Sequence, residues 1–206
     1  MTAAFLVDVY ETLVHCDFGA RGTVLADLAG ADPGRFNRGL LSLAPELDLG
    51  RISIEVALTT AVRDSGGIMR PGLYEDFCRA YSEDAQLFPD AIPFLGAARE
   101  RGIPVAVVSN CSTDTRPMLE AMGVLDLVDA AVLSCEIGHA KPSPEIYAHA
   151  LASLGALASE TVFVDDQLRY CDGAVAAGVT AIQIARSGAQ ERDGFPVIRS
   201  LMELVG

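Results

Sequence analysis

The chain lacks the features that assign a protein to membranes or to nucleic acid. Its apolar runs fall well short of the roughly 20 residues that cross a bilayer, and its start carries no basic segment of the kind that opens a signal peptide. Acidic residues outnumber basic ones by 28 to 15, so the formal net charge is −13. Phosphate backbones and anionic lipid surfaces repel such a chain. We therefore expect neither a nucleic-acid nor a membrane partner.

Cysteines with metal-binding or redox spacing are also missing. The chain has 5 cysteines, an odd number, and no two of them are spaced C-x-x-C. This pattern favours free thiols in a reducing compartment and argues against a zinc site. We expect a cytoplasmic protein.

What remains is the composition of a globular protein, with 206 residues of which 50% are apolar and 21% charged. Apolar runs rich in β-branched residues alternate with helical patterns, which is typical of a parallel sheet covered by helices on both faces. We predict an α/β fold with a Rossmann-like parallel sheet. The predicted strands cover 3–9, 103–108, 130–133, 161–164 and 180–184; the predicted helices cover 90–101, 116–122, 143–154, a segment ending at 177, and 197–205.

One region interrupts this alternation. Residues 15–85 show helical spacing alone, as in Ile54, Leu58 and Val62, which follow one another at intervals of four. We predict an α/β core made of residues 1–14 and 86–206, with residues 15–85 inserted as a small all-helical cap. An insertion directly after the first strand would lie over the carboxyl end of that strand and act as a lid.

Polar side chains follow the predicted strands where those strands end. Asp8 ends the first strand, Ser109 and Asn110 follow the second, and Asp165 and Asp166 follow the fourth. In parallel sheets, ligands bind beyond the carboxyl ends of the strands. Converging carboxylates suit a hard dication, so we expect Mg²⁺. An aspartate in such a site can also serve as a nucleophile.

Lysine is almost absent from the chain, because 14 of the 15 basic residues are arginine. The single lysine is Lys141, which precedes Pro142 at a strand–helix junction. Since the chain uses arginine wherever any cation suffices, a lone lysine indicates a position that needs a compact ammonium group. We expect Lys141 to hold a substrate anion.

Four segments resemble, in order and spacing, the motifs of the haloacid dehalogenase-like hydrolase superfamily, in the subgroup with a helical cap after the first motif. The resemblance covers almost the whole chain. The segments are FLVDVYETL at 5–13, VVSN at 107–110, HAKPSPEIY at 139–147, and VFVDD at 162–166 followed by DGAVAAG at 172–178.

The resemblance implies a role for each matching residue. Asp8 would be the nucleophile that accepts a phosphoryl group, and Thr12 would orient the loop of the first motif. Lys141, Ser109 and the backbone of Asn110 would bind the phosphoryl oxygens. The Mg²⁺ ligands would be Asp8, the backbone carbonyl of Tyr10, and Asp166, with Asp165 close behind or in direct contact.

Two departures from the family pattern leave alternatives open. Phosphatases of the family carry an aspartate as general acid and base two residues after the nucleophile. Here that position is occupied by Tyr10, as in the L-2-haloacid dehalogenase branch. The next position, usually a glycine in the family, is occupied by Glu11. That branch lacks the acidic pair kept here as Asp165 and Asp166. We give the acidic pair more weight than Tyr10, because adjacent carboxylates beside Asp8 would repel one another without a cation.

The preferred hypothesis is therefore a Mg²⁺-dependent phosphohydrolase that forms an aspartyl-phosphate at Asp8, with Tyr10 and Lys141 as further catalytic candidates. Its substrate would be a small phosphate ester. The alternatives are an L-2-haloacid dehalogenase acting on a 2-halo acid, with Arg35 or Arg38 as a halide or carboxylate ligand, and a catalytically weak relative that binds a phosphometabolite or a protein. For both arginines a solvated helix face is the preferred interpretation. The sequence does not indicate an oligomeric state.

Overall fold

The computed structural model describes residues 2, 4–186 and 192–206, without the side chains of Tyr81 and Ser82. Six parallel strands form one sheet in the order β5-β4-β1-β6-β7-β8. Their bounds are β1 Ala4–Val7, β4 Val105–Ser109, β5 Ala130–Leu133, β6 Thr161–Asp165, β7 Thr180–Ile184 and β8 Val197–Ile198. The α/β prediction with a parallel, Rossmann-like sheet is confirmed. The first predicted strand begins at Ala3, which lies outside the described residues.

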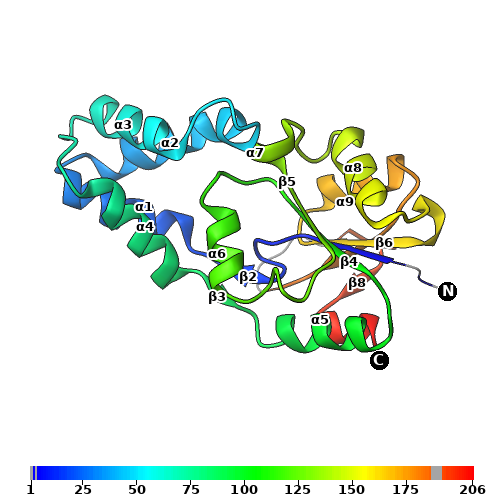
Figure 1. Ribbon diagram of the computed structural model, residues 1–206. Helices are drawn as coiled ribbons and strands as arrows, with labels where there is room; N and C mark the ends of the chain where they lie inside the picture. The colour runs from blue at the N-terminus through cyan, green and yellow to red at the C-terminus, as the bar shows by residue number, and fades with distance from the viewer. Residues whose placement is uncertain (1, 3, 187–191) are drawn as a thin grey trace.

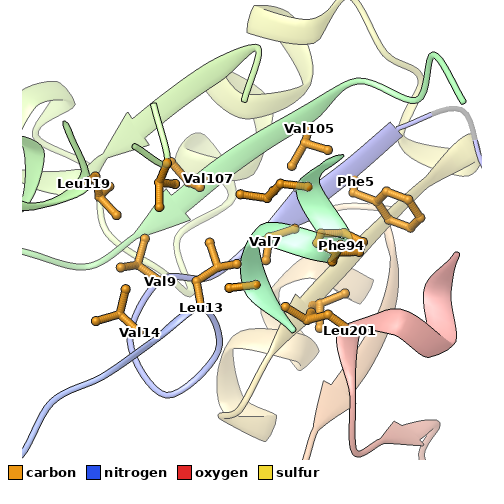
Figure 2. Packing of buried hydrophobic residues seen from close by; sticks show 14 of the residues in the cluster. Phe5, Val7, Val9, Leu13, Val14, Phe94, Val105, Val107, Leu119 and Leu201 are labelled. Atoms are coloured by element: carbon orange, nitrogen blue, oxygen red, sulfur yellow. The ribbon is translucent and has the colours of Figure 1, made fainter. Parts of the chain in front are cut away.

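Helices cover both faces of this sheet, and the strands are apolar on both sides for that reason. On β1, Phe5 and Val7 pack into one core layer and Leu6 into the other, as the two-residue period of a strand requires. Figure 1 shows α8 and α9 over one face, and α5 with the C-terminal segment over the other. Figure 2 shows the α5 layer, where Phe5 meets Phe94 edge-on at 5.4 Å between ring centres. The helices of the sheet domain are α5 Ala91–Glu100, α6 Thr115–Ala121, α7 Ser134–Ile137, α8 Pro144–Leu154 and α9 Leu168–Ala176, with a 3-10 turn at Ala158–Glu160.

The predicted helical insertion consists of four helices, called the helical unit below: α1 Phe18–Ala29, α2 Pro33–Asp48, α3 Ile54–Asp64 and α4 Leu73–Asp84. Three of them have an N-cap side chain: Asp17, Asp32 and Ser53 each accept a hydrogen bond from a backbone N–H in the first turn. The unit has an apolar core of its own, built around Leu25, Phe36, Leu58 and Phe77 among others. It lies beside the carboxyl end of the sheet (Figure 1).

A short antiparallel ribbon joins the helical unit to the sheet domain. Its strands are β2 Val14–His15 and β3 Gln86–Leu87, and Val14 pairs with Leu87. The chain thus leaves and re-enters the sheet domain at one place, directly after β1. This position sets the helical unit next to the strand ends that carry the polar residues.

The prediction of a last helix over 197–205 is wrong. Val197 and Ile198 instead form β8, parallel to β7, because two β-branched residues satisfy the open edge of that strand. A 3-10 turn follows at Leu201–Leu204. It begins at Ser200, whose side chain accepts from the backbone while Glu203 accepts from the N–H of Ser200. Among the described residues, no helix is long and apolar enough to cross a bilayer.

Candidate active site

The ends of three neighbouring strands converge at one point. β1 lies between β4 and β6, and Val7 is level with Val107 on one side and Val164 on the other. The backbone N–H of Asp8 donates to the carbonyl of Val164 at 2.9 Å, which continues the ladder by one residue. The side chain of Asp8 therefore lies beside the end of β6, where Asp165 is the last residue.

Lys141 lies between these two aspartates. Its Nζ donates to Oδ1 of Asp8 at 2.5 Å and to Oδ2 of Asp165 at 2.6 Å, and its side chain is 0% exposed. Burial opposes the ammonium charge, but attraction by Asp165 and Asp8 outweighs that cost and raises the pKa of Lys141 above its ordinary value. The rings of Tyr170 and Phe163 lie under the same ammonium group, 4.8 and 5.5 Å from Nζ. The only lysine of the chain is thus buried in the site, where two carboxylates favour its charged form.

Asn110 fixes the backbone that carries Lys141. Its Nδ2 donates to the carbonyl of Lys141 at 2.9 Å, and its Oδ1 accepts from the N–H of Lys141 at 2.7 Å. Nδ2 also lies 3.3 Å from the hydroxyl of Tyr170. The sequence motif indicated a backbone role for Asn110; this positioning role of its side chain was missed. Ser109 is fully buried beside it, with Oγ 3.4 Å from the carbonyl of Asn110.

Three carboxylates gather at the site, since Asp8, Asp165 and Asp166 each offer an oxygen within 4.8 Å of the others. Burial raises the pKa of Asp8 to about 7, against a lowering by Lys141 and a further rise caused by Asp165. Burial likewise raises the pKa of Asp166 to about 7, with repulsion from Asp8 adding to it, and that of Asp165 to about 6. Three buried carboxylates that repel one another are a fitting donor set for a small, hard dication.

Both carboxylate oxygens of Asp165 accept hydrogen bonds from the protein. One of its oxygens accepts from Lys141, and the other accepts from the backbone N–H of Gln167 at 2.8 Å. Asp166 is less buried than the other two. Asp8 and Asp166 are therefore better placed than Asp165 to bind a cation directly.

The turn after β1 holds Tyr10 and Glu11 in different directions. The hydroxyl of Tyr10 is 2.7 Å from Oγ1 of Thr115. Glu11 has a φ of 57°, in the left-handed region that favours glycine, and its carboxylate accepts from the N–H of Cys16 at 3.1 Å and lies 2.9 Å from Nδ1 of His15. These bonds hold the Glu11 carboxylate on the ribbon side of the turn. Thr12 is fully buried, and among the described residues its Oγ1 has no hydrogen-bond partner.

A cavity of about 540 Å³ separates the strand ends from the helical unit. Asp8, Tyr10, Asn110 and Lys141 line it from the sheet side. The helical unit contributes mainly apolar side chains to the opposite wall. Gly50 brings the end of α2 against Cys135 of the sheet domain, at a distance that leaves no room for a Cβ atom. This contact helps to hold the two walls at their spacing.

Further polar residues of the cavity were missed in the sequence: Arg21, Asp48 and Asn37 of the helical unit, Ser112 and Asp114 after β4, and Gln167 and Tyr170 near the start of α9. No local pattern marks the first two, because their place depends on how the helices pack. Arg35 and Arg38, considered as anion ligands, are exposed and do not line the cavity. Arg35 instead donates to the carbonyl of Asp64 at 3.0 Å. Both arginines thus lie on a solvated helix face, as the preferred interpretation of the sequence had it.

Together the parallel sheet, the helical unit placed after β1 and the aspartate–lysine cluster define an α/β protein with a carboxylate-rich site at its strand ends. The chain belongs to the haloacid dehalogenase-like hydrolase family, whose model matches residues 2–178. The resemblance seen in the sequence motifs is thereby confirmed, and with it the class of enzyme.

Comparison with individual proteins gives both phosphatases and dehalogenases. The chain is 40% identical to Phosphatase MT3486 of Mycobacterium tuberculosis over 60% of this chain and 57% of that protein. It is 30% identical to (S)-2-haloacid dehalogenase 1 of a Pseudomonas species over 68% of this chain and 61% of that protein. The chain therefore spans little more than half the length of these curated relatives.

A solved structure shares the whole architecture. It is a haloacid dehalogenase family enzyme from Bacteroides thetaiotaomicron, in complex with magnesium and inorganic phosphate. The TM-score is 0.76, with 94% of this chain and 98% of that chain covered, at 19% identity. At this identity the likeness establishes the fold.

Proposed function

We propose that the protein is a Mg²⁺-dependent phosphohydrolase that acts on small phosphate esters through an aspartyl-phosphate at Asp8. The observation that carries this proposal is the cluster of Asp8, Asp165 and Asp166, with oxygens within 4.8 Å of one another beside a buried lysine. A haloacid dehalogenase needs no cation to displace halide, so it gains nothing from two further carboxylates that repel its nucleophile. The magnesium-bound neighbour and the phosphatase relative support the same reading.

In this proposal Asp8, Asp166 and the backbone carbonyl of Tyr10 hold the cation, with Asp165 behind them. When bound, Mg²⁺ neutralises charge on the phosphoryl oxygens. An oxygen of Asp8 attacks phosphorus, the bond from phosphorus to the ester oxygen breaks, and the alkoxide leaves as an alcohol after taking a proton. Water then attacks phosphorus, which releases inorganic phosphate and regenerates Asp8. One ester and one water give one alcohol and one phosphate.

The remaining residues bind and orient the phosphoryl group. Lys141 places its ammonium beside Asp8, where it stabilises charge on the transferring oxygens, and Asp165 and Asn110 hold Lys141 there. Ser109 and the backbone of Asn110 supply hydrogen bonds to the same oxygens, and Thr12 orients the turn. Residues 15–85 serve as the cap that closes over the bound ester.

The proton for the leaving alkoxide is the weak point of this site. Tyr10 stands where relatives carry an aspartate, and a phenol of ordinary pKa about 10 donates a proton but is a poor base near neutrality. Glu11 is bonded to Cys16 and His15, away from the cavity. We therefore infer that water takes the place of the general base in the second step, which makes the enzyme slow.

A second candidate, L-2-haloacid dehalogenase, has two observations in its favour. Tyr10 matches that branch, and a relative is a named (S)-2-haloacid dehalogenase. In that reaction Asp8 would attack carbon and release halide without a cation. A catalytically weak binding protein is the third candidate, because the acid–base aspartate is absent.

One panel separates the three. Phosphate esters and 2-halo acids, 2-chloropropionate among them, are assayed with Mg²⁺ and with EDTA. The proposal expects phosphate release with Mg²⁺, its loss in EDTA and its return when Mg²⁺ is restored. Full dehalogenation of 2-chloropropionate in EDTA would establish the second candidate, and binding of phosphate esters without turnover would establish the third.

A further inference from the structure

The wall of the cavity opposite Asp8 is mainly apolar. Apolar side chains of the helical unit line it beside Arg21, Asn37 and Asp48, and six of the apolar ones are Phe18, Leu25, Leu41, Leu47, Ile54 and Phe77. Four of the six are buried, namely Leu25, Leu47, Ile54 and Phe77. The cavity is continuous from this wall to the nucleophile, since Asp8 and Lys141 line it as well. Whatever is esterified to a phosphoryl group at Asp8 therefore projects against these side chains.

Two of the six are exposed although they face the cavity. Phe18 is 50% and Leu41 74% exposed. Apolar surface left in water beside a nucleophile is surface that a ligand can bury, with a gain proportional to its area. A hydroxyl, amino or carboxyl group of a sugar or amino acid that is buried against these six side chains finds no hydrogen-bond partner on them, which costs free energy.

The charges in the same wall do not favour a second anionic group. Asp48, at the end of α2, adds a carboxylate to the cavity. The guanidinium of Arg21 lies over the rings of Phe18 and Phe77, at 4.7 and 5.6 Å, and donates to Sγ of Cys16 at 3.1 Å. The arginine is thus engaged within the wall, with its charge on aromatic faces.

We propose that the substrate is the phosphate monoester of an uncharged, apolar alcohol, whose hydrocarbon part packs against Phe18, Leu41 and the buried apolar side chains of the same wall. This inference rests on the proposed phosphohydrolase function and names its substrate class. Leu41 and Phe18 determine specificity, and Asp48 selects against substrates that carry a second phosphate or a carboxylate.

The test uses a series of straight-chain alkyl phosphates from ethyl to octyl. Their leaving groups have nearly equal pKa, so differences in kcat/KM report contacts made by the chain. Each added methylene should raise kcat/KM about two- to fourfold until the cavity is filled. Glycerol phosphate and ω-carboxyalkyl phosphates of matched length should be turned over less well than the alkyl esters. A flat or falling series, or a preference for the glycerol ester, overturns the proposal.

Variants at two exposed leucines test whether the dependence on chain length arises in the cavity. Leu41→Asp should lower the ratio of the octyl to the ethyl kcat/KM by at least about tenfold. Leu157→Asp is the matched control, because Leu157 is 65% exposed and lies outside the cavity lining; it should keep the wild-type ratio. Equal ratios in wild type and Leu41→Asp would overturn the assignment.

The outcomes also distinguish a failure of the proposed substrate class from a failure of the proposed phosphohydrolase function. Hydrolysis of ethyl and aryl phosphates without any dependence on chain length removes the substrate class alone. A preference for ω-carboxyalkyl esters that is lost in Arg21→Met, in a variant that still melts cooperatively, assigns the wall to carboxylate recognition instead. If no phosphate ester is hydrolysed with Mg²⁺, the phosphohydrolase function and the substrate class fall together.

Discussion

Asn110 and Lys141, 31 residues apart in the chain, are joined by two reciprocal hydrogen bonds between the amide side chain of one and the backbone of the other, at 2.9 and 2.7 Å. The pair ties the loop after β4 to the segment before α8. Because the ammonium of Lys141 contacts Asp8 and Asp165, the amide of Asn110 determines indirectly where the positive charge lies relative to the nucleophile.

Asn110→Ala tests this positioning role. The variant leaves a buried N–H and a carbonyl without their partner, which should cost about 1–3 kcal/mol of unfolding free energy. It should also lower kcat by at least about tenfold, because Lys141 is no longer fixed. Urea denaturation and steady-state kinetics measure the two effects. Loss of stability with an unchanged kcat would show that Asn110 is structural only.

Lys141→Arg keeps the charge and changes its shape. The planar, bulkier guanidinium does not fit between two carboxylates that the compact ammonium bridges at 2.5 and 2.6 Å. We expect kcat to fall by about 10²-fold or more, the loss typical of one preorganised charge partner. Arg63→Lys is the matched exchange on the surface, where the side chain is 72% exposed, and it should leave kcat unchanged. A Lys141→Arg variant at near-wild-type rate would contradict the role of Lys141.

Tyr10→Asp should restore the missing acid and base. With an aspartate at this position, the alkoxide has a proton donor and the attacking water has a base, so turnover of alkyl phosphates should rise by about 10²-fold. Wild type should already favour good leaving groups such as p-nitrophenyl phosphate. Tyr10→Phe, which loses the hydroxyl and its bond to Thr115, should show no gain. If wild type hydrolyses alkyl esters quickly and Tyr10→Asp slows it, Tyr10 itself serves the chemistry.

Protons and Mg²⁺ should compete at the carboxylate cluster. Burial holds the pKa of Asp8 and of Asp166 near 7, above the ordinary value of an aspartate. Between about pH 4 and pH 7 the metal-free folded state therefore binds protons that the unfolded chain has lost, so its stability falls as the pH rises through this window. Mg²⁺ replaces those protons, and it should raise the Tm more at about pH 8 than at about pH 5.5. Equal shifts at both values would show that the cluster does not bind the cation.

Much of the site was predictable from the sequence because it depends on strand ends. A buried apolar run followed by Asp8, or by Asp165 and Asp166, brings those side chains to one edge of any parallel sheet. The lone Lys141 was marked by composition. The cavity wall was not predictable in the same way, since Arg21 and Asp48 reach it only through the packing of α1 and α2 against the sheet domain. The strand at Val197 was missed for a similar reason, because its pairing with β7 is not visible in local periodicity.

The chemical state of Asp8 during turnover tests the central claim most directly. Enzyme is mixed with p-nitrophenyl phosphate and Mg²⁺, quenched in acid and digested. The mass of the peptide that contains Asp8 is then measured by mass spectrometry. Because Tyr10 is a poor base, the intermediate should accumulate, and the peptide should gain the mass of one phosphoryl group on Asp8. The gain should be absent in EDTA and in Asp8→Asn. Phosphate release with Asp8 unmodified throughout, or an ester on Asp8 formed from 2-chloropropionate in EDTA, would contradict the account.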